Sequence, residues 1–116
     1  MPYIAVTTSA PVSPETAEAV KTELGKIITT FPGKTEGSLM VSISGGNTMF
    51  FGGVKKHCAY VDIRLFRTVP KEAKEQFTEA AIALVAEKIG IPTGDIFLSI
   101  AEYPSWGFKG KMFHDN

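Results

Sequence analysis

The sequence predicts an α+β fold (an α/β sandwich) in which a duplicated βαβ unit forms a four-stranded mixed sheet with two helices on one face. The first observation behind this prediction is an internal repeat, because the chain overlays itself at a constant offset of 57 residues, with Tyr3 on Tyr60. The second is that each copy, about residues 3–43 and 60–100, places a helical apolar stripe between two short strand-like runs. The third is the length of 116 residues, which suits one domain over residues 1–116.

In the first copy, residues 3–7 form a short apolar, β-branched run that is typical of a strand. Residues 13–15 (Ser-Pro-Glu) indicate a helix start, with Ser as the N-cap, Pro at the first helical position and an acid in the first turn. The helix is predicted from apolar residues at helical spacing: Ala17, Val20, Leu24, Ile27, Ile28 and Phe31. Residues 32–33 (Pro-Gly) end it, and residues 39–43 alternate as a strand does.

The second copy repeats this order. Its first strand is expected over residues 58–65, its helix after Pro70 and its last strand over residues 96–101. The apolar stripe of this helix consists of Ala73, Phe77, Ala80, Ala81, Leu84 and Ile89. Paired glycines in the link between the copies predict turns, and residues 102–116 remain as an apolar C-terminal tail.

The arrangement leaves one face of the sheet without helices, because right-handed crossovers place both helices on the same side. The strands are nevertheless apolar at consecutive positions, as in residues 3–6 and 96–98. A sheet whose second face meets water should alternate apolar and polar residues more cleanly. We therefore expect other copies of the chain to cover that face.

Composition and charge exclude several classes of function. Twelve Lys and Arg balance twelve Asp and Glu, so the net charge of +0 favours neither nucleic acid nor an anionic membrane as a partner. The single cysteine, Cys58, permits no intrachain disulfide, which fits a reducing compartment. The longest apolar run, residues 80–86, is far shorter than the ~20 residues of a membrane span. Since no secretory leader opens the chain, we expect a cytoplasmic location, with non-classical secretion left open.

Pro2 is the first candidate for chemistry. If Met1 is removed, as is common before a small residue, Pro2 carries a secondary amine instead of an amide nitrogen. An α-amino group titrates near about 7.7–8.0, and burial in an apolar pocket lowers that pKa because it disfavours the cation. An amine with a pKa near neutrality is what a general base requires. If Met1 is retained, Pro2 has no useful basicity.

Four segments together carry a resemblance. They are Met-Pro-Tyr-Ile at the start, Pro-Gly-Lys at 32–34, Met-Phe-Phe-Gly-Gly at 49–53, and the aromatic tail over 106–113. In this order, and over nearly the full length, the chain resembles the macrophage migration inhibitory factor branch of the tautomerase superfamily. The resemblance implies the doubled βαβ fold, assembled as a homotrimer with active sites at subunit interfaces.

The resemblance also implies a function, a keto–enol tautomerase acting on phenylpyruvate-like α-keto acids. It makes Pro2 the catalytic base and Lys34 the residue that binds the substrate carboxylate, which the backbone amide of Phe66 also contacts. The other implied pocket residues are Phe97 and Ser99, lent by a neighbouring subunit, and Trp106, Phe108 and Phe113 of the tail. No cofactor is expected, and no metal either, since His57 and His114 have no ligand spacing around them.

Several positions depart from the family pattern. Phe97 stands where the family usually has Tyr, and Ser99 where it usually has Asn. Arg67 begins the segment that replaces the glycines expected after Phe66, and it adds a second cation that would favour diacids. Two alternatives therefore stay open: a cytokine-like signalling protein that binds a receptor and has vestigial catalysis, or a hydratase or dehalogenase that uses protonated Pro2 with Arg64 and Arg67.

Overall fold

The computed structural model describes residues 1–115 and confirms the predicted fold class. The first copy consists of β1 (Pro2–Thr8), α1 (Pro14–Ile27) and β2 (Met40–Ser44), and the second of β5 (Ala59–Phe66), α2 (Lys71–Val85) and β6 (Ile96–Tyr103). Two hairpins are added to this frame: β3 (Phe50–Phe51) with β4 (Val54–Lys55), and β7 (Ser105–Phe108) with β8 (Lys111–His114). The main strands lie within two residues of their predicted bounds.

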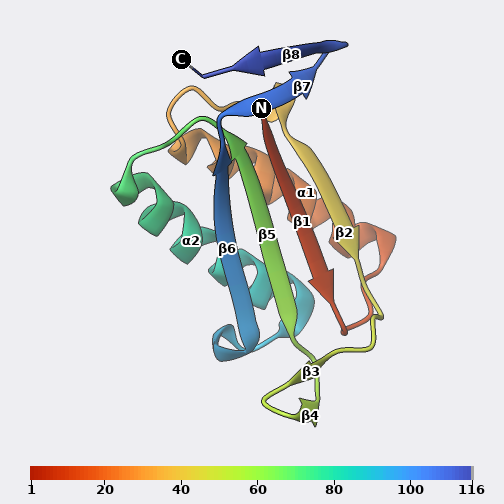
Figure 1. The fold of residues 1–116 in the computed structure, drawn as a ribbon. Coiled ribbons are helices and arrows are strands. Elements are labelled where there is room, and N and C mark those ends of the chain that lie inside the picture. Colours follow the sequence, from red (N-terminus) through yellow and green to blue (C-terminus); the bar gives the residue numbers. More distant parts are fainter. Residues whose placement is uncertain (116) are drawn as a thin grey trace.

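The four main strands form one mixed sheet in the order β2-β1-β5-β6 (Figure 1). Each copy contributes a parallel pair, β1 with β2 and β5 with β6, and the two copies join where β1 pairs antiparallel with β5. Ala5 and Asp62 are partners in that register, and they are also equivalent under the offset of 57. The local twofold relation between the two copies is therefore centred on this pair.

The start of α1 and the turn after it follow from the local sequence. Ser13 is the N-cap of α1, where its Oγ accepts a hydrogen bond from the backbone N–H of Thr16 at 3.1 Å, and Pro14 occupies the first helical position. Beyond Ile27 the chain tightens into a short 3₁₀ turn over residues 28–30. Gly33 then adopts a φ of 76°, which reverses the chain toward the sheet.

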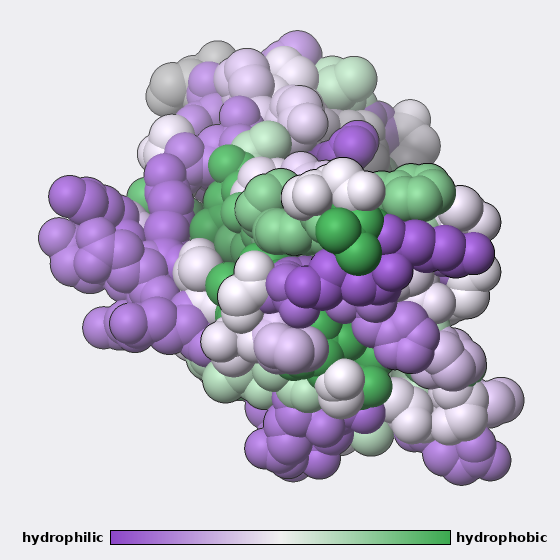
Figure 2. All heavy atoms as spheres, turned by 90° about the horizontal axis from the view of Figure 1, so that it is seen from below, coloured by the Kyte–Doolittle hydropathy of each residue, from purple (hydrophilic) through white to green (hydrophobic). Residues whose placement is uncertain are grey.

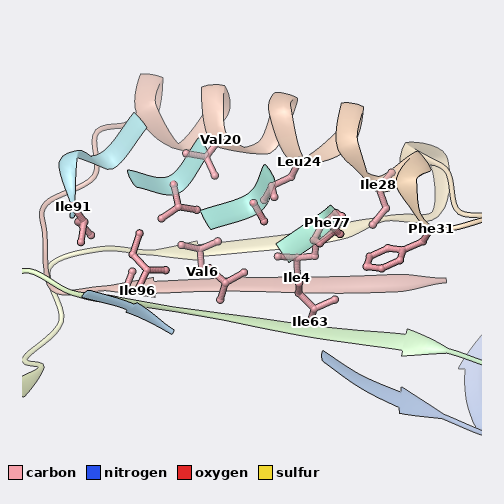
Figure 3. Close-up of a cluster of buried hydrophobic side chains, with 14 of the residues drawn as sticks. Ile4, Val6, Val20, Leu24, Ile28, Phe31, Ile63, Phe77, Ile91 and Ile96 are labelled. Carbon is pink, nitrogen blue, oxygen red and sulfur yellow. The ribbon is translucent and has the colours of Figure 1, made fainter. Parts of the chain in front are cut away.

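The hydrophobic core lies between the two helices and one face of the sheet (Figure 3). Phe31 and Phe77 stack toward one end of it with ring centroids 4.5 Å apart, so the segment after α1 packs on α2 there. Each fully buried side chain of this kind contributes about 1.5–3 kcal/mol. The largest such side chains are Phe31, Phe77, Ile4, Leu24, Ile28, Ile63, Leu65, Val6, Val20, Val61 and Val85.

The second face of the sheet requires a correction, because it is mixed and not apolar throughout. Strand alternation buries Ile4 and Val6 against the helices and turns Tyr3 and Ala5 the other way, where they are half-buried. Serines and charged groups share this outer face, but large apolar groups lie there too, with Phe97 63% exposed. The other exposed large apolar or aromatic residues on the four main strands are Met40, Tyr60 and Tyr103.

The two hairpins lie at opposite ends of the sheet (Figure 1). Residues 52–53 form the predicted glycine turn between β3 and β4, both at positive φ. The end that carries this hairpin exposes apolar side chains among polar ones (Figure 2), Phe50 and Val54 being more than half exposed. At the other end the predicted tail is a β7–β8 hairpin, which turns on Lys109 and Gly110 at φ 52° and 76°.

Candidate active site

Pro2 is the first residue of β1 and is buried. It pairs in register with Leu65, next to the last residue of β5, so it lies where β1 begins and β5 ends. A strand flanked by neighbours on both sides holds this position rigidly. A rigid position of this kind is what a group that transfers protons requires, because the group must stay aligned with its substrate.

Lys34 is brought to the same end of the sheet by the turn at Gly33. Its backbone N–H donates to the carbonyl of Phe31 at 3.1 Å, and its half-buried ammonium donates to the carbonyl oxygen of Phe66 at 2.8 Å. Burial lowers the pKa of Lys34, and the positive charge of Arg67 lowers it further. The ammonium therefore lies within the site and not in bulk solvent.

Met1 completes this end. Its carbonyl oxygen accepts a hydrogen bond from the backbone N–H of Phe66 at 3.3 Å. Burial lowers the pKa of the Met1 amine, and the charge of Lys34 adds to that effect. The terminal amine and the Lys34 ammonium thus lie close enough for their charges to interact, and hydrogen bonds join both Met1 and Lys34 to the backbone of Phe66. Two cationic groups at one end of the sheet are suited to binding an anion.

The predicted aromatic residues of the tail lie over the same end of the sheet, because β7 and β8 cross it beside the N-terminus (Figure 1). Trp106 is half-buried and packs edge-on against Tyr103, with centroids 6.1 Å apart. Phe108 and Phe113 pack together at 6.5 Å, each nearly 40% exposed. Such a cluster can cover an apolar ligand.

Phe97 and Ser99 do not reach this end in one chain. By register, Phe97 lies level with Thr7, five residues from Pro2 along β1, and Ser99 lies level with Ala5. At about 3.4 Å per residue, these levels are about 17 Å and 10 Å from Pro2. Only a second chain could bring the two residues to Pro2, as the resemblance implies.

Two features of the site escape sequence analysis. The Tyr60 hydroxyl shares a hydrogen bond with Ser99 Oγ, and Tyr60 pairs in register with Phe97, so the phenol that position 97 lacks is present on the adjacent strand. Glu102 accepts hydrogen bonds from the Val69 backbone N–H at 2.7 Å and from Lys74 at 2.9 Å. Only the cross-strand register could indicate the Tyr60–Ser99 hydrogen bond. The Glu102 hydrogen bonds join residues 28 or more positions apart, which no local sequence pattern indicates.

Two further findings concern residues 1–115. Within them no group of three or more potential ligands is placed to hold a metal ion. The helices formed by these residues are also too short or too polar for a membrane span.

The fold and this cluster define a class, the MIF-like α+β proteins of the tautomerase superfamily. A family model described as "Macrophage migration inhibitory factor (MIF)" matches residues 1–114, and the chain belongs to that family. The family includes tautomerase enzymes.

Known relatives agree with this assignment over almost their whole length. A macrophage migration inhibitory factor homolog of Brugia malayi is 24% identical over 97% of this chain and 99% of its own. The crystal structure of Leishmania major MIF2 superimposes with a TM-score of 0.91 at 21% identity, covering 97% of both chains. The MIF-like protein of Entamoeba histolytica gives a TM-score of 0.85 at 25% identity, covering 97% of this chain and 98% of its own.

Proposed function

We propose that the chain is a keto–enol tautomerase acting on phenylpyruvate-like 2-oxo acids, with Pro2 as the general base. The observation that carries this proposal is the meeting of Pro2, the Lys34 ammonium and the Phe66 backbone N–H at one end of the sheet. Membership of a family that includes tautomerases supports it. The chemistry rests on removal of Met1, which makes the Pro2 nitrogen a free amine.

The proposed mechanism moves one proton. Lys34 and the Phe66 N–H bind the carboxylate, while Trp106 and the other aromatic residues of the β7–β8 hairpin cover the apolar part of the substrate. The uncharged Pro2 nitrogen takes the proton from the carbon beside the ketone and returns it to the ketone oxygen, which gives the enol. Atoms and electrons balance without another reactant. Excluding water strengthens the Lys34 contact and keeps the amine pKa low.

The positions of Phe97, Ser99 and Met40 support a homotrimer as the functional form. Phe97 and Ser99 lie about 17 Å and 10 Å along the sheet from Pro2, and the outer face retains exposed apolar groups such as Met40. Light scattering is expected to give three times the 12.5 kDa chain mass. Replacing Phe97 with Glu should lower that mass, because a charge would be buried at the interface. A monomeric wild-type protein would contradict the expectation.

The direct test of the function is tautomerisation of phenylpyruvate, followed by the absorbance of its enol. Protein that begins at Pro2 should accelerate the reaction, and Pro2→Gly should lower kcat/KM about tenfold or more, because the flexible primary amine of glycine is less well positioned. Circular dichroism shows whether the variant is folded. A folded Pro2→Gly protein with full activity would contradict the assignment of the base.

A hydratase-type reaction is the second candidate, favoured by the position of Arg67 beside Phe66 and within reach of the Lys34 charge. There Pro2 would act as a protonated acid. The pH profile separates the two functions, because a base gains activity as pH rises through the amine pKa, whereas an acid loses it.

A further inference from the structure

Arg67 is held in an unusual and well-defined position at the end of β5. Its φ of 74° lies in the left-handed region, which disfavours residues other than glycine. Its backbone N–H donates to the Tyr103 carbonyl at 2.9 Å. Val69, two residues further along the chain, donates its backbone N–H to the Glu102 carboxylate at 2.7 Å, so hydrogen bonds fix the chain at Arg67 and just after it. Strained positions of this kind persist where the surrounding structure enforces them, and they cluster at ligand sites.

The guanidinium of Arg67 lies beside the carboxylate site proposed above. Its central carbon is 5.0 Å from the centre of the Phe66 ring, and its charge acts on Lys34, which bonds the Phe66 carbonyl. The side chain is 60% exposed, so it is free to meet a ligand. Arginine presents a planar fork of donors that matches a carboxylate in a bidentate manner.

The partner of Arg67 within the chain is weak. The Asp115 carboxylate approaches its Nε at 3.7 Å, too far for a hydrogen bond, and both side chains are exposed. A cavity of about 110 Å³ adjoins this pair, lined by Arg67, Thr68, Glu102, Tyr103, Pro104 and Asp115. It has room for a carboxylate group. The Glu102 carboxylate is occupied by Val69 and Lys74.

We infer that Arg67 is a second carboxylate-binding residue, and that the site prefers 2-oxo acids carrying a second carboxylate to their monocarboxylate counterparts. One carboxylate binds Lys34 and the Phe66 N–H, and the other displaces Asp115 from Arg67. The inference rests on the proposed function for the location of the first carboxylate. It adds a substrate class that the phenylpyruvate assay does not examine.

The test compares glutarate with pentanoate, two unreactive five-carbon acids that differ in one carboxylate. Binding to the chain that begins at Pro2 is measured by amide chemical shifts of Phe66 and Arg67. Glutarate should bind about fivefold more tightly, the gain expected from one further charge pair at a partly exposed site. In Arg67→Gly the two acids should bind equally. Glycine accepts the positive φ, so this variant keeps the backbone while losing the guanidinium.

Lys109 offers a matched control. It is also a cation at positive φ, and its ammonium lies over the Phe108 ring as Arg67 lies over Phe66. Lys109→Gly should keep the preference for glutarate, and Asp115→Asn should increase it because the competing carboxylate is gone. Equal binding by the wild-type protein, a preference kept in Arg67→Gly, or the same loss in Lys109→Gly would overturn the inference. Because the readout is binding, a confirmed preference stands even if the protein shows no tautomerase activity. Conversely, an active tautomerase without the preference refutes only this inference.

Discussion

Protein that retains Met1 is expected to have at least about 100-fold lower tautomerase activity than protein that begins at Pro2, the lower end of what a general base contributes. Two effects act together. With Met1 in place the Pro2 nitrogen belongs to an amide, which has no useful basicity. In addition, the Met1 carbonyl oxygen accepts the Phe66 N–H at 3.3 Å, so it occupies the donor that the substrate carboxylate would use.

The two effects are separable. Preparations with and without Met1, verified by intact mass, are compared both for activity and for binding of an unreactive acid such as pentanoate. Retention of Met1 should weaken binding as well as abolish catalysis. Acetylating the Pro2 nitrogen of the shorter chain restores a carbonyl without the methionine side chain, and it should reproduce both losses. Equal activity of the two preparations would exclude Pro2 as the base.

Replacing Lys34 with Gln is expected to lower kcat/KM for phenylpyruvate about 10- to 100-fold, because a charge-assisted hydrogen bond to the carboxylate is lost. The variant should also move the rising limb of the pH profile to higher pH. Burial first, and then the charge of Lys34, lower the pKa of the terminal amine, as the Met1 amine shows. Removing that charge raises the amine pKa, so the neutral, basic form is populated only at higher pH.

Lys34→Arg is the conservative comparison. It keeps the positive charge, so the rising limb of the pH profile should stay at the same pH. Lys21→Gln, an exposed lysine on α1, should change neither quantity. The shift can be checked without catalysis in the chain that retains Met1, where NMR titration of the Met1 amine should give a higher pKa in Lys34→Gln. An unchanged limb together with an unchanged amine pKa would show that Lys34 does not influence the N-terminus.

The sequence predicts the fold well because its signals are local and occur twice. Ser13 and Pro14 set the helix start, the apolar stripes set the buried faces, and the constant offset relates the two copies. The β7–β8 hairpin is not predicted, since it depends on Lys109 adopting a positive φ that its residue type disfavours.

The site is predicted less completely than the fold. Pro2, Lys34 and Phe66 lie at the same end of the sheet, but the resemblance, not the residue pattern, is what singles out Lys34. The Tyr60–Ser99 hydrogen bond depends on strand register, and no spacing along the chain encodes it. The weak contact of Arg67 with Asp115 joins residues 48 positions apart. Such contacts become visible only once the sheet is assembled.

The N-terminus and the last strand, β8, lie at the same end of the sheet, over the residues proposed for catalysis (Figure 1). An affinity tag, a fusion partner or a surface linker attached at the N-terminus or within the β7–β8 hairpin would therefore stand in front of the substrate. The β3–β4 turn at Gly52 and Gly53 lies at the far end of the same chain. Phe51 of this hairpin packs on Phe97 with ring centroids 4.9 Å apart, so in the proposed trimer the turn lies beside a neighbouring subunit's site. Reporter labels for this protein belong on the exposed face of a helix, for example at Lys21 of α1, away from the N-terminus, the β7–β8 hairpin and this turn.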